Sequence, residues 1–183
     1  MPLVMAGCAG SAGAGILARQ FAGPLGKRFP AFLMKNCLKE GGRLLIREAA
    51  REALLAGSVF LVPVSHGGVL AALWEMGEIA GCGLEADIRR IPIRQETIEI
   101  CEYLDGNPYQ LYGQGALLCA CRRPEALCES LREAGWEAEV IGCLTKQRAR
   151  ILRNGEEIRY LEKPQPDAWQ VMIKCNIGKC ETS

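Results

Sequence analysis

The 183-residue chain has a single histidine, His66, and few aromatic residues, 6% of the total. One histidine excludes any metal site that needs a pair of histidine ligands. Charge is nearly balanced, with 22 Lys+Arg against 21 Asp+Glu, so neither a basic surface for nucleic acid nor an acidic tail is indicated. No apolar run is long enough to cross a bilayer, and the N-terminus lacks the charged region of a signal peptide. We therefore expect a soluble, cytoplasmic protein that binds neither nucleic acid nor membrane.

Paired Cys-x-x-Cys motifs are also absent, although the chain has ten cysteines. Cysteine zinc sites usually need such pairs, so no metal site is predicted. Cys119 and Cys121 alternate along an apolar segment and should share one face of a strand. Cys175 and Cys180 lie close together in a polar C-terminal context, where a metal or disulfide role stays open. For the others among apolar neighbours we expect buried, reduced thiols, namely Cys37, Cys82, Cys101, Cys128 and Cys143.

The length and the 49% hydrophobic content fit one domain, or a domain with a short appendage. Residue patterns predict helices at 13–21, 43–56, 68–80, 95–103 and 124–133. They predict strands at 59–64, 84–88, 116–121, 138–143, 148–152 and 157–161. Clear periodicity ends near residue 163, so we expect a domain at 1–163 and a C-terminal extension at 164–183. Because the helices segregate from a mixed, partly antiparallel sheet, the predicted class is α+β.

The most informative segment is residues 64–80, where a strand ends in a polar turn, Ser65-His66-Gly67-Gly68, and a helix follows. The first amides of a helix have no partner within it and bind anions readily. Glycine also lets a ligand approach the backbone closely. We therefore predict a phosphate or carboxylate at the amides of residues 66–69, although a purely structural tight turn is an open alternative. His66 could contact that anion or transfer a proton, or could be a solvated turn residue. One apolar face is predicted for the helix, formed by Val69, Ala72, Leu73, Met76 and Ile79.

Four segments together resemble the C-terminal domain of the aminoimidazole ribonucleotide (AIR) synthase superfamily, also called PurM-like: residues 10–13, 64–80, 91–97 and 112–117. This superfamily includes AIR synthase, selenophosphate synthetase, thiamine-monophosphate kinase and the hydrogenase maturation protein HypE. The similarity is greatest to AIR synthase-related and HypE-like proteins. The resemblance implies a three-layer α/β/α fold with a mixed sheet, partly ferredoxin-like in topology. It also implies that Gln114 and Gly115 approach the same pocket as the glycine turn, unless they form only a flexible connector.

The sequence departs from the family pattern where many members carry carboxylates. Pro63, Ala12 and Gln114 are neutral at three such positions. Family members usually have a preceding N-terminal domain with most of the ATP and metal contacts, whereas this chain opens on the C-terminal domain. HypE carries its modified group on a C-terminal cysteine, and Cys180 lacks the usual Pro-Arg-Ile-Cys context. These departures favour a domain with no catalytic residues and no cofactor of its own, with ATP and Mg²⁺ only if a separate partner supplies the site.

Three hypotheses follow from these observations. The first is a binding or accessory module for a phosphorylated or carboxylated small molecule. The second is half of an ATP-dependent enzyme, completed by a separate N-terminal-domain partner. The third is a protein-interaction subunit, with a homodimer as one form. Phosphate contacts could also come from four arginines, Arg43, Arg89, Arg90 and Arg94, although surface ion pairs explain most arginines.

Overall fold

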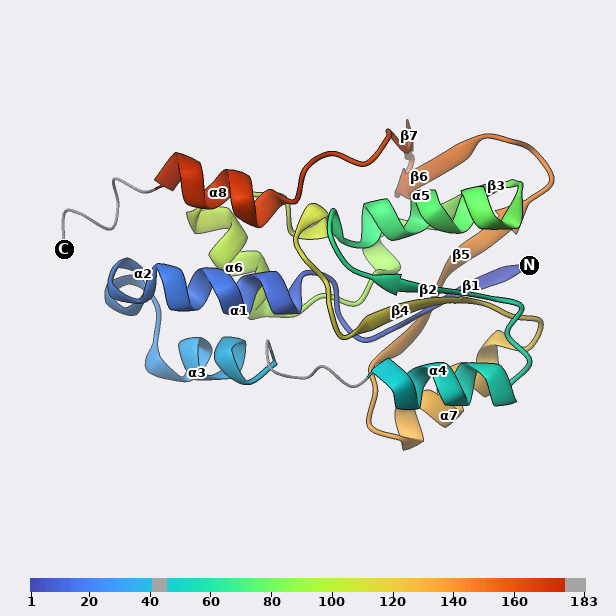
Figure 1. Cartoon of the computed structure of the whole chain (residues 1–183), viewed down its shortest axis with the longest axis horizontal. Coiled ribbons are helices and arrows are strands. Elements are labelled where there is room, and N and C mark those ends of the chain that lie inside the picture. Colours follow the sequence, from blue (N-terminus) through green and yellow to red (C-terminus); the bar gives the residue numbers. More distant parts are fainter. Residues whose placement is uncertain (41–45, 177–183) are drawn as a thin grey trace.

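The computed structural model describes residues 1–40 and 46–176 and contains a seven-stranded mixed sheet (Figure 1). The strand order is β2-β4-β1-β5-β3-β6-β7. The strands are β1 (Pro2–Ala6), β2 (Phe60–Val64), β3 (Gly83–Asp87), β4 (Ala116–Ala120), β5 (Ala138–Thr145), β6 (Arg150–Asn154) and β7 (Glu157–Tyr160). All pairs are antiparallel except β3 with β6, so the predicted mixed, partly antiparallel sheet is confirmed.

Helices cover both faces of this sheet. Helix α5 (Gly68–Ala80) packs on one face, while α4 (Ile46–Leu55) and α7 (Pro124–Glu133) lie on the other (Figure 1). Alternation along β4 sends Leu118 to the α5 face and Leu117 and Cys119 to the α4 and α7 face. Cys121 lies with Cys119, which confirms their shared face. The α+β class and the three layers are therefore as predicted.

A third group of helices lies beyond one end of the sheet (Figure 1). It contains α1 (Ser11–Gln20), α2 (Ala22–Arg28), α3 (Ala31–Glu40), α6 (Gln95–Tyr103) and α8 (Ala168–Asn176). Its core includes Leu17, Phe21, Ile100 and Leu111, with Met172 contributed by α8. The extension that begins at residue 164 thus contains a helix that packs against the domain. None of the described helices is long and apolar enough to cross a membrane.

Some detailed expectations were wrong. Ile79 is 49% exposed, because the buried face of α5 ends with Met76 and Gly77 before the helix terminates at Gly81. Cys143 is exposed because it points away from the sheet face that buries its neighbour Leu144. Arg43 and Cys180 lie outside the described residues.

Candidate functional site

The segments that join the strands and helices meet at the end of the sheet next to the third helix group. We call this region the loop end, formed by residues 7–13, 65–68, 92–95, 111–115 and 135–137. Backbone hydrogen bonds connect the segments to one another. The Gly7 amide donates to the Glu137 carbonyl and the Ala9 amide to that of Pro92. The Gly13 amide donates to the Tyr112 carbonyl and the Gly113 amide to that of Ser65. All four segments that carry the family resemblance therefore take part in one structure.

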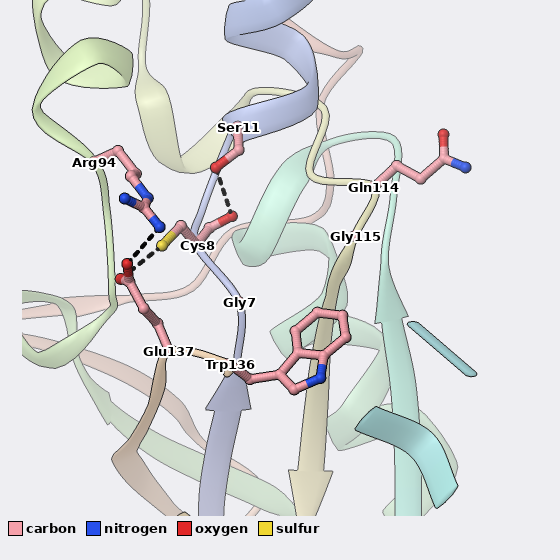
Figure 2. A pocket seen from close by; sticks show the side chains of 8 residues that line it. All are labelled: Gly7, Cys8, Ser11, Arg94, Gln114, Gly115, Trp136 and Glu137. Carbon is pink, nitrogen blue, oxygen red and sulfur yellow. Dashed lines mark hydrogen bonds and ion pairs between the residues drawn. The ribbon is translucent and has the colours of Figure 1, made fainter. Parts of the chain in front are cut away.

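A small hollow opens in the loop end, with a volume of about 30 Å³. Figure 2 shows Cys8 and Arg94 both pointing toward Glu137. The Cys8 thiol donates to Oε2 of Glu137 at 2.9 Å, and the Arg94 guanidinium lies 2.6 Å from Oε1 of the same carboxylate. The remaining lining comes from Gly7, Ser11, Gln114, Gly115 and Trp136. Since the volume fits about one water-sized group, only part of a larger ligand could enter the hollow.

The Cys8 side chain is a neutral thiol in this setting. Burial raises its pKa to about 12, and the hydrogen bond to Glu137 contributes in the same direction. Arg94 has the opposite but smaller effect on that pKa. Because the thiolate is the nucleophilic form of cysteine, Cys8 is suited to hydrogen bonding rather than nucleophilic attack at neutral pH.

The glycine turn, residues 65–68, has the predicted position directly before α5. Gly67 and Gly68 both have positive φ, 75° and 65°. A Cβ atom on Gly68 would lie 2.4 Å from the Tyr109 carbonyl oxygen and 2.7 Å from that of Leu111. Gly68 is thus needed for close packing within the chain itself, which supplies a structural reason for this glycine.

A carboxylate of the same chain is bound at the glycine turn. Asp167 Oδ2 accepts a hydrogen bond from the Gly67 amide at 2.9 Å. Its Oδ1 accepts from the Tyr112 amide at 3.1 Å and from the Trp169 amide at 3.2 Å. The Asp167 side chain is 1% exposed. Charge-assisted bonds from three amides compensate the desolvation of this buried carboxylate.

His66 and Gln114 flank the same turn on its solvent side. The His66 side chain is 67% exposed, and its ring lies 4.7 Å from the Tyr112 ring, between centroids. His66 Nδ1 is 3.7 Å from Asp167 Oδ2, beyond hydrogen-bond distance. The Tyr112 hydroxyl donates to Gln114 Oε1 at 2.6 Å. The Gln114 side chain points away from the Cys8 group in Figure 2.

The structure places all six predicted residues at the loop end: Ser65, His66, Gly67, Gly68, Gln114 and Gly115. They do not line one pocket, because Gln114 and Gly115 line the hollow whereas Gly67 lines a separate cavity. Whether they bind a ligand stays a prediction. Sequence reasoning missed Cys8, Glu137 and Asp167. For Asp167 a signal was present, because aspartate is a preferred residue directly before a helix. Of the candidate arginines, Arg94 lines the hollow, whereas Arg89 pairs with Asp87 and Arg90 with Glu139.

The donor atoms at the loop end do not fit Mg²⁺ with ATP. Magnesium prefers carboxylate oxygens. The hollow has one carboxylate, Glu137, which already pairs with Arg94, and Asp167 is bound by backbone amides. Among the described residues there is no group of three His, Cys, Asp or Glu side chains that could hold a metal ion.

Comparison with known proteins gives a family match over most of the chain. Residues 5–153 match the family described as AIR synthase related protein, C-terminal domain. Carbamoyl dehydratase HypE of Azotobacter vinelandii is 30% identical over 93 residues, which are 49% of this chain and 27% of that protein.

Solved structures show the same fold. The hydrogenase maturation protein HypE of E. coli superposes with a TM-score of 0.71 at 21% identity, covering 92% of this chain and 51% of HypE. A chain from a HypE–HypF complex superposes with a TM-score of 0.68 at 14% identity, covering 89% of this chain and 52% of that chain. The chain therefore spans about half the length of the solved relatives that it matches.

Proposed function

The chain belongs to the AIR synthase-related C-terminal-domain family, and from this premise we propose that it is a binding or accessory module for a phosphate- or carboxylate-bearing small molecule. The loop end is its binding surface, with the glycine turn on one side and Arg94 on the other. The single observation that carries this proposal is the convergence of the four family segments there.

The chemistry of the loop end supports binding better than catalysis. The glycine turn lies at the start of α5, where its Gly67 amide already holds a carboxylate and its Gly68 amide donates to the Ser65 carbonyl at 3.1 Å. Arg94 adds a guanidinium, which suits phosphate and carboxylate geometry, and its Nη2 already pairs with the Glu137 carboxylate, so an anion would share this arginine with Glu137. The hollow beside it contains a protonated thiol and a carboxylate paired with arginine rather than an activated nucleophile with a base. The module therefore binds and presents its ligand without transforming it.

Thermal unfolding with inorganic phosphate or ATP tests this proposal. Both ligands should raise the Tm of the wild-type chain, because binding to the folded state stabilises it. The Arg94→Gln variant should lose most of that increase, while Arg132→Gln should keep it. Arg132 is a matched control because it is an exposed arginine that pairs with Glu139. An equal increase in all three proteins would exclude Arg94 from the site, and no increase in any of them would contradict the proposal.

A second candidate function is half of an ATP-dependent active site whose other wall comes from a separate protein. The hollow beside Arg94 favours it, because its volume of about 30 Å³ is far below the roughly 300–1,000 Å³ of a complete small-molecule site, so a partner would have to complete the site on that side. The chain also spans only about half of the HypE chains it resembles. In this case the partner would supply the metal-binding carboxylates.

Mixing the chain with the isolated N-terminal half of a HypE protein separates the two functions. ATP hydrolysis that requires both proteins, and that falls with Arg94→Gln, would support the completed-enzyme function. Complex formation without hydrolysis would support the accessory function.

HypE is described in a complex with HypF, so association with a second protein, or with a second copy of this chain, belongs to the same proposal. Size-exclusion chromatography with light scattering gives the mass of the complex, and so measures association with a second protein and with a second copy of this chain.

A further inference from the structure

Asp167 lies at the amino ends of two helices at once. Through Oδ1 it accepts from the Trp169 amide in the first turn of α8, which makes it the N-cap of that helix. Through Oδ2 it accepts from the amide of Gly67, the N-cap residue of α5. The Tyr112 amide at 3.1 Å completes the set of donors. One carboxylate therefore connects the glycine turn, the loop before β4 and the C-terminal helix.

We infer that Asp167 is a tethered internal ligand of the glycine turn, and that a small-molecule anion reaches the turn by displacing it. This inference rests on the proposed anion-binding function. A carboxylate and a phosphate make the same kind of contact with amides at a helix start. Because the Gly67 amide has one hydrogen, Asp167 and an external anion compete for it.

The segment that carries Asp167 is held mainly at its two ends. Leu161 is buried at one end and Asp167 at the other, while the intervening residues 162–166, which we call the strap, are all exposed. A cavity of about 560 Å³ lies between the strap and the first turn of α5, lined among others by Gly67, Leu70 and Gln165. The strap is thus exposed along its length, but Ala168, directly after Asp167, belongs to the core of the third helix group. Asp167 can therefore leave the turn only if the first turn of α8 moves with it.

Displacement has a consequence for α8. When Asp167 leaves the turn, α8 loses its cap or must reorient together with it. Helix α8 packs against α1 through Met172 and its neighbours. Anion binding at the turn should therefore loosen the first turn of α8, about 100 residues away in sequence from Gly67. The C-terminal helix becomes a reporter of whether the anion site is filled.

His66 allows a direct test because it is the only histidine in the chain. Its ring gives one isolated NMR signal next to the turn, which can be followed while inorganic phosphate is added. A tethered group competes at an effective concentration of about millimolar. Asp167→Ala should therefore bind phosphate at least about tenfold more tightly than the wild type. Glu129→Ala is the matched control, since it removes one exposed carboxylate from α7, on the opposite face of the sheet from α5, and should bind as the wild type does.

A second measurement covers the case in which Asp167→Ala perturbs folding. Hydrogen exchange of the wild-type α8 amides should accelerate when phosphate saturates the His66 signal. Equal phosphate affinity in wild type and Asp167→Ala, or unchanged protection of α8 at saturation, would overturn the inference while leaving the proposed function intact. If phosphate changed neither the His66 signal nor the Tm in any variant, both this inference and the proposed function would be overturned.

Discussion

Cys8 illustrates how one residue's surroundings decide what it can do. A thiol beside an arginine is usually activated, because a positive charge favours the thiolate. Here Glu137 lies between Cys8 and Arg94 and binds both. Burial and this carboxylate raise the Cys8 pKa to about 12, and Arg94 lowers it only in part. The side chain therefore acts as a hydrogen-bond donor that fixes the Glu137 carboxylate.

Replacing Glu137 by Gln should make Cys8 more reactive. The substitution removes the negative charge that opposes thiolate formation and leaves Arg94 nearby, so the Cys8 pKa should fall. At pH 8.5, alkylation of Cys8 by iodoacetamide, followed by mass spectrometry, should be about three- to tenfold faster than in the wild type. Glu139→Gln, on the adjoining strand, should leave the rate unchanged. An unaltered rate in Glu137→Gln would contradict the assigned role of the carboxylate.

Gly68 gives a second prediction for a single residue. Gly68→Ala adds a methyl group that collides with two carbonyl oxygens, and it also places alanine at a φ of 65°. Gly81→Ala, at the other end of α5, has a similar φ of 63° but no atom within 4 Å of the added Cβ. Urea unfolding should show a loss of about 1 kcal/mol for Gly81→Ala and clearly more, about 2–4 kcal/mol, for Gly68→Ala. Equal losses would show that packing against residues 109–111 is unimportant.

At the level of elements, α5 and α8 are connected through Asp167, which caps α8 and binds the amide of Gly67 at the start of α5. Helix starts have unpaired amides that must find partners. Gly67 provides no side-chain cap for α5, and Asp167 from the C-terminal segment accepts a hydrogen bond from the amide of Gly67 itself. The contact joins the C-terminal extension to the loop end of the domain.

Asp167→Ala should therefore destabilise the fold even though it removes few apolar contacts. Three amides lose a charged acceptor, and the expected loss in the free energy of unfolding is about 1–3 kcal/mol. Asp167→Asn, which keeps an acceptor oxygen, should lose less. Chemical denaturation measures both variants. A stability equal to that of the wild type in Asp167→Ala would mean that water replaces the carboxylate at no cost.

The elements that were predicted correctly have strong local signals. Helix α5 has regular apolar spacing and glycines at both ends, and α7 begins at Pro124 as expected. Helices α2 and α3 were missed because Gly23, Pro24, Gly26 and Pro30 interrupt the pattern between residues 22 and 40. The contact of Asp167 with Gly67 could not be predicted, because it depends on how distant segments pack.

For the whole molecule, the thiols make stability sensitive to alkaline pH. Burial raises the pKa of four cysteines to about 12 from an ordinary value of 9.0, namely Cys8, Cys37, Cys101 and Cys119. The folded chain keeps these protons while the unfolded chain loses them. Their contribution is therefore complete below pH 9 and is lost as the pH rises from 9 toward 12.

Urea unfolding at pH 7.5 and pH 10 tests whether the free energy of unfolding falls as the pH rises. Each of the four thiols should lower the free energy of unfolding by about 1–2 kcal/mol at pH 10. In Cys119→Ala, the difference in the free energy of unfolding between pH 7.5 and pH 10 should be smaller by the contribution of one thiol, about 1–2 kcal/mol. This holds whatever the substitution does to stability at pH 7.5. A free energy that is the same at both pH values would contradict the assignment of buried, protonated thiols.

For the described part of the chain, the sheet and its helices support the proposed binding surface at the loop end. A sheet with helices on both faces holds the loop end in place, and that surface contains both the glycine turn and the hollow at Arg94. The small volume of the hollow, about 30 Å³, is consistent with a module that either binds weakly alone or is completed by another protein.

The most direct test of this account is an NMR titration of the ¹⁵N-labelled chain with inorganic phosphate and with ATP. We predict that the amide signals that change lie together at residues 7–11, 66–69 and 112–115. We also predict that Arg94→Gln weakens the response. Changes scattered over the rest of the sheet and its helices, or no change at millimolar ligand, would contradict the assignment of the loop end as an anion-binding surface.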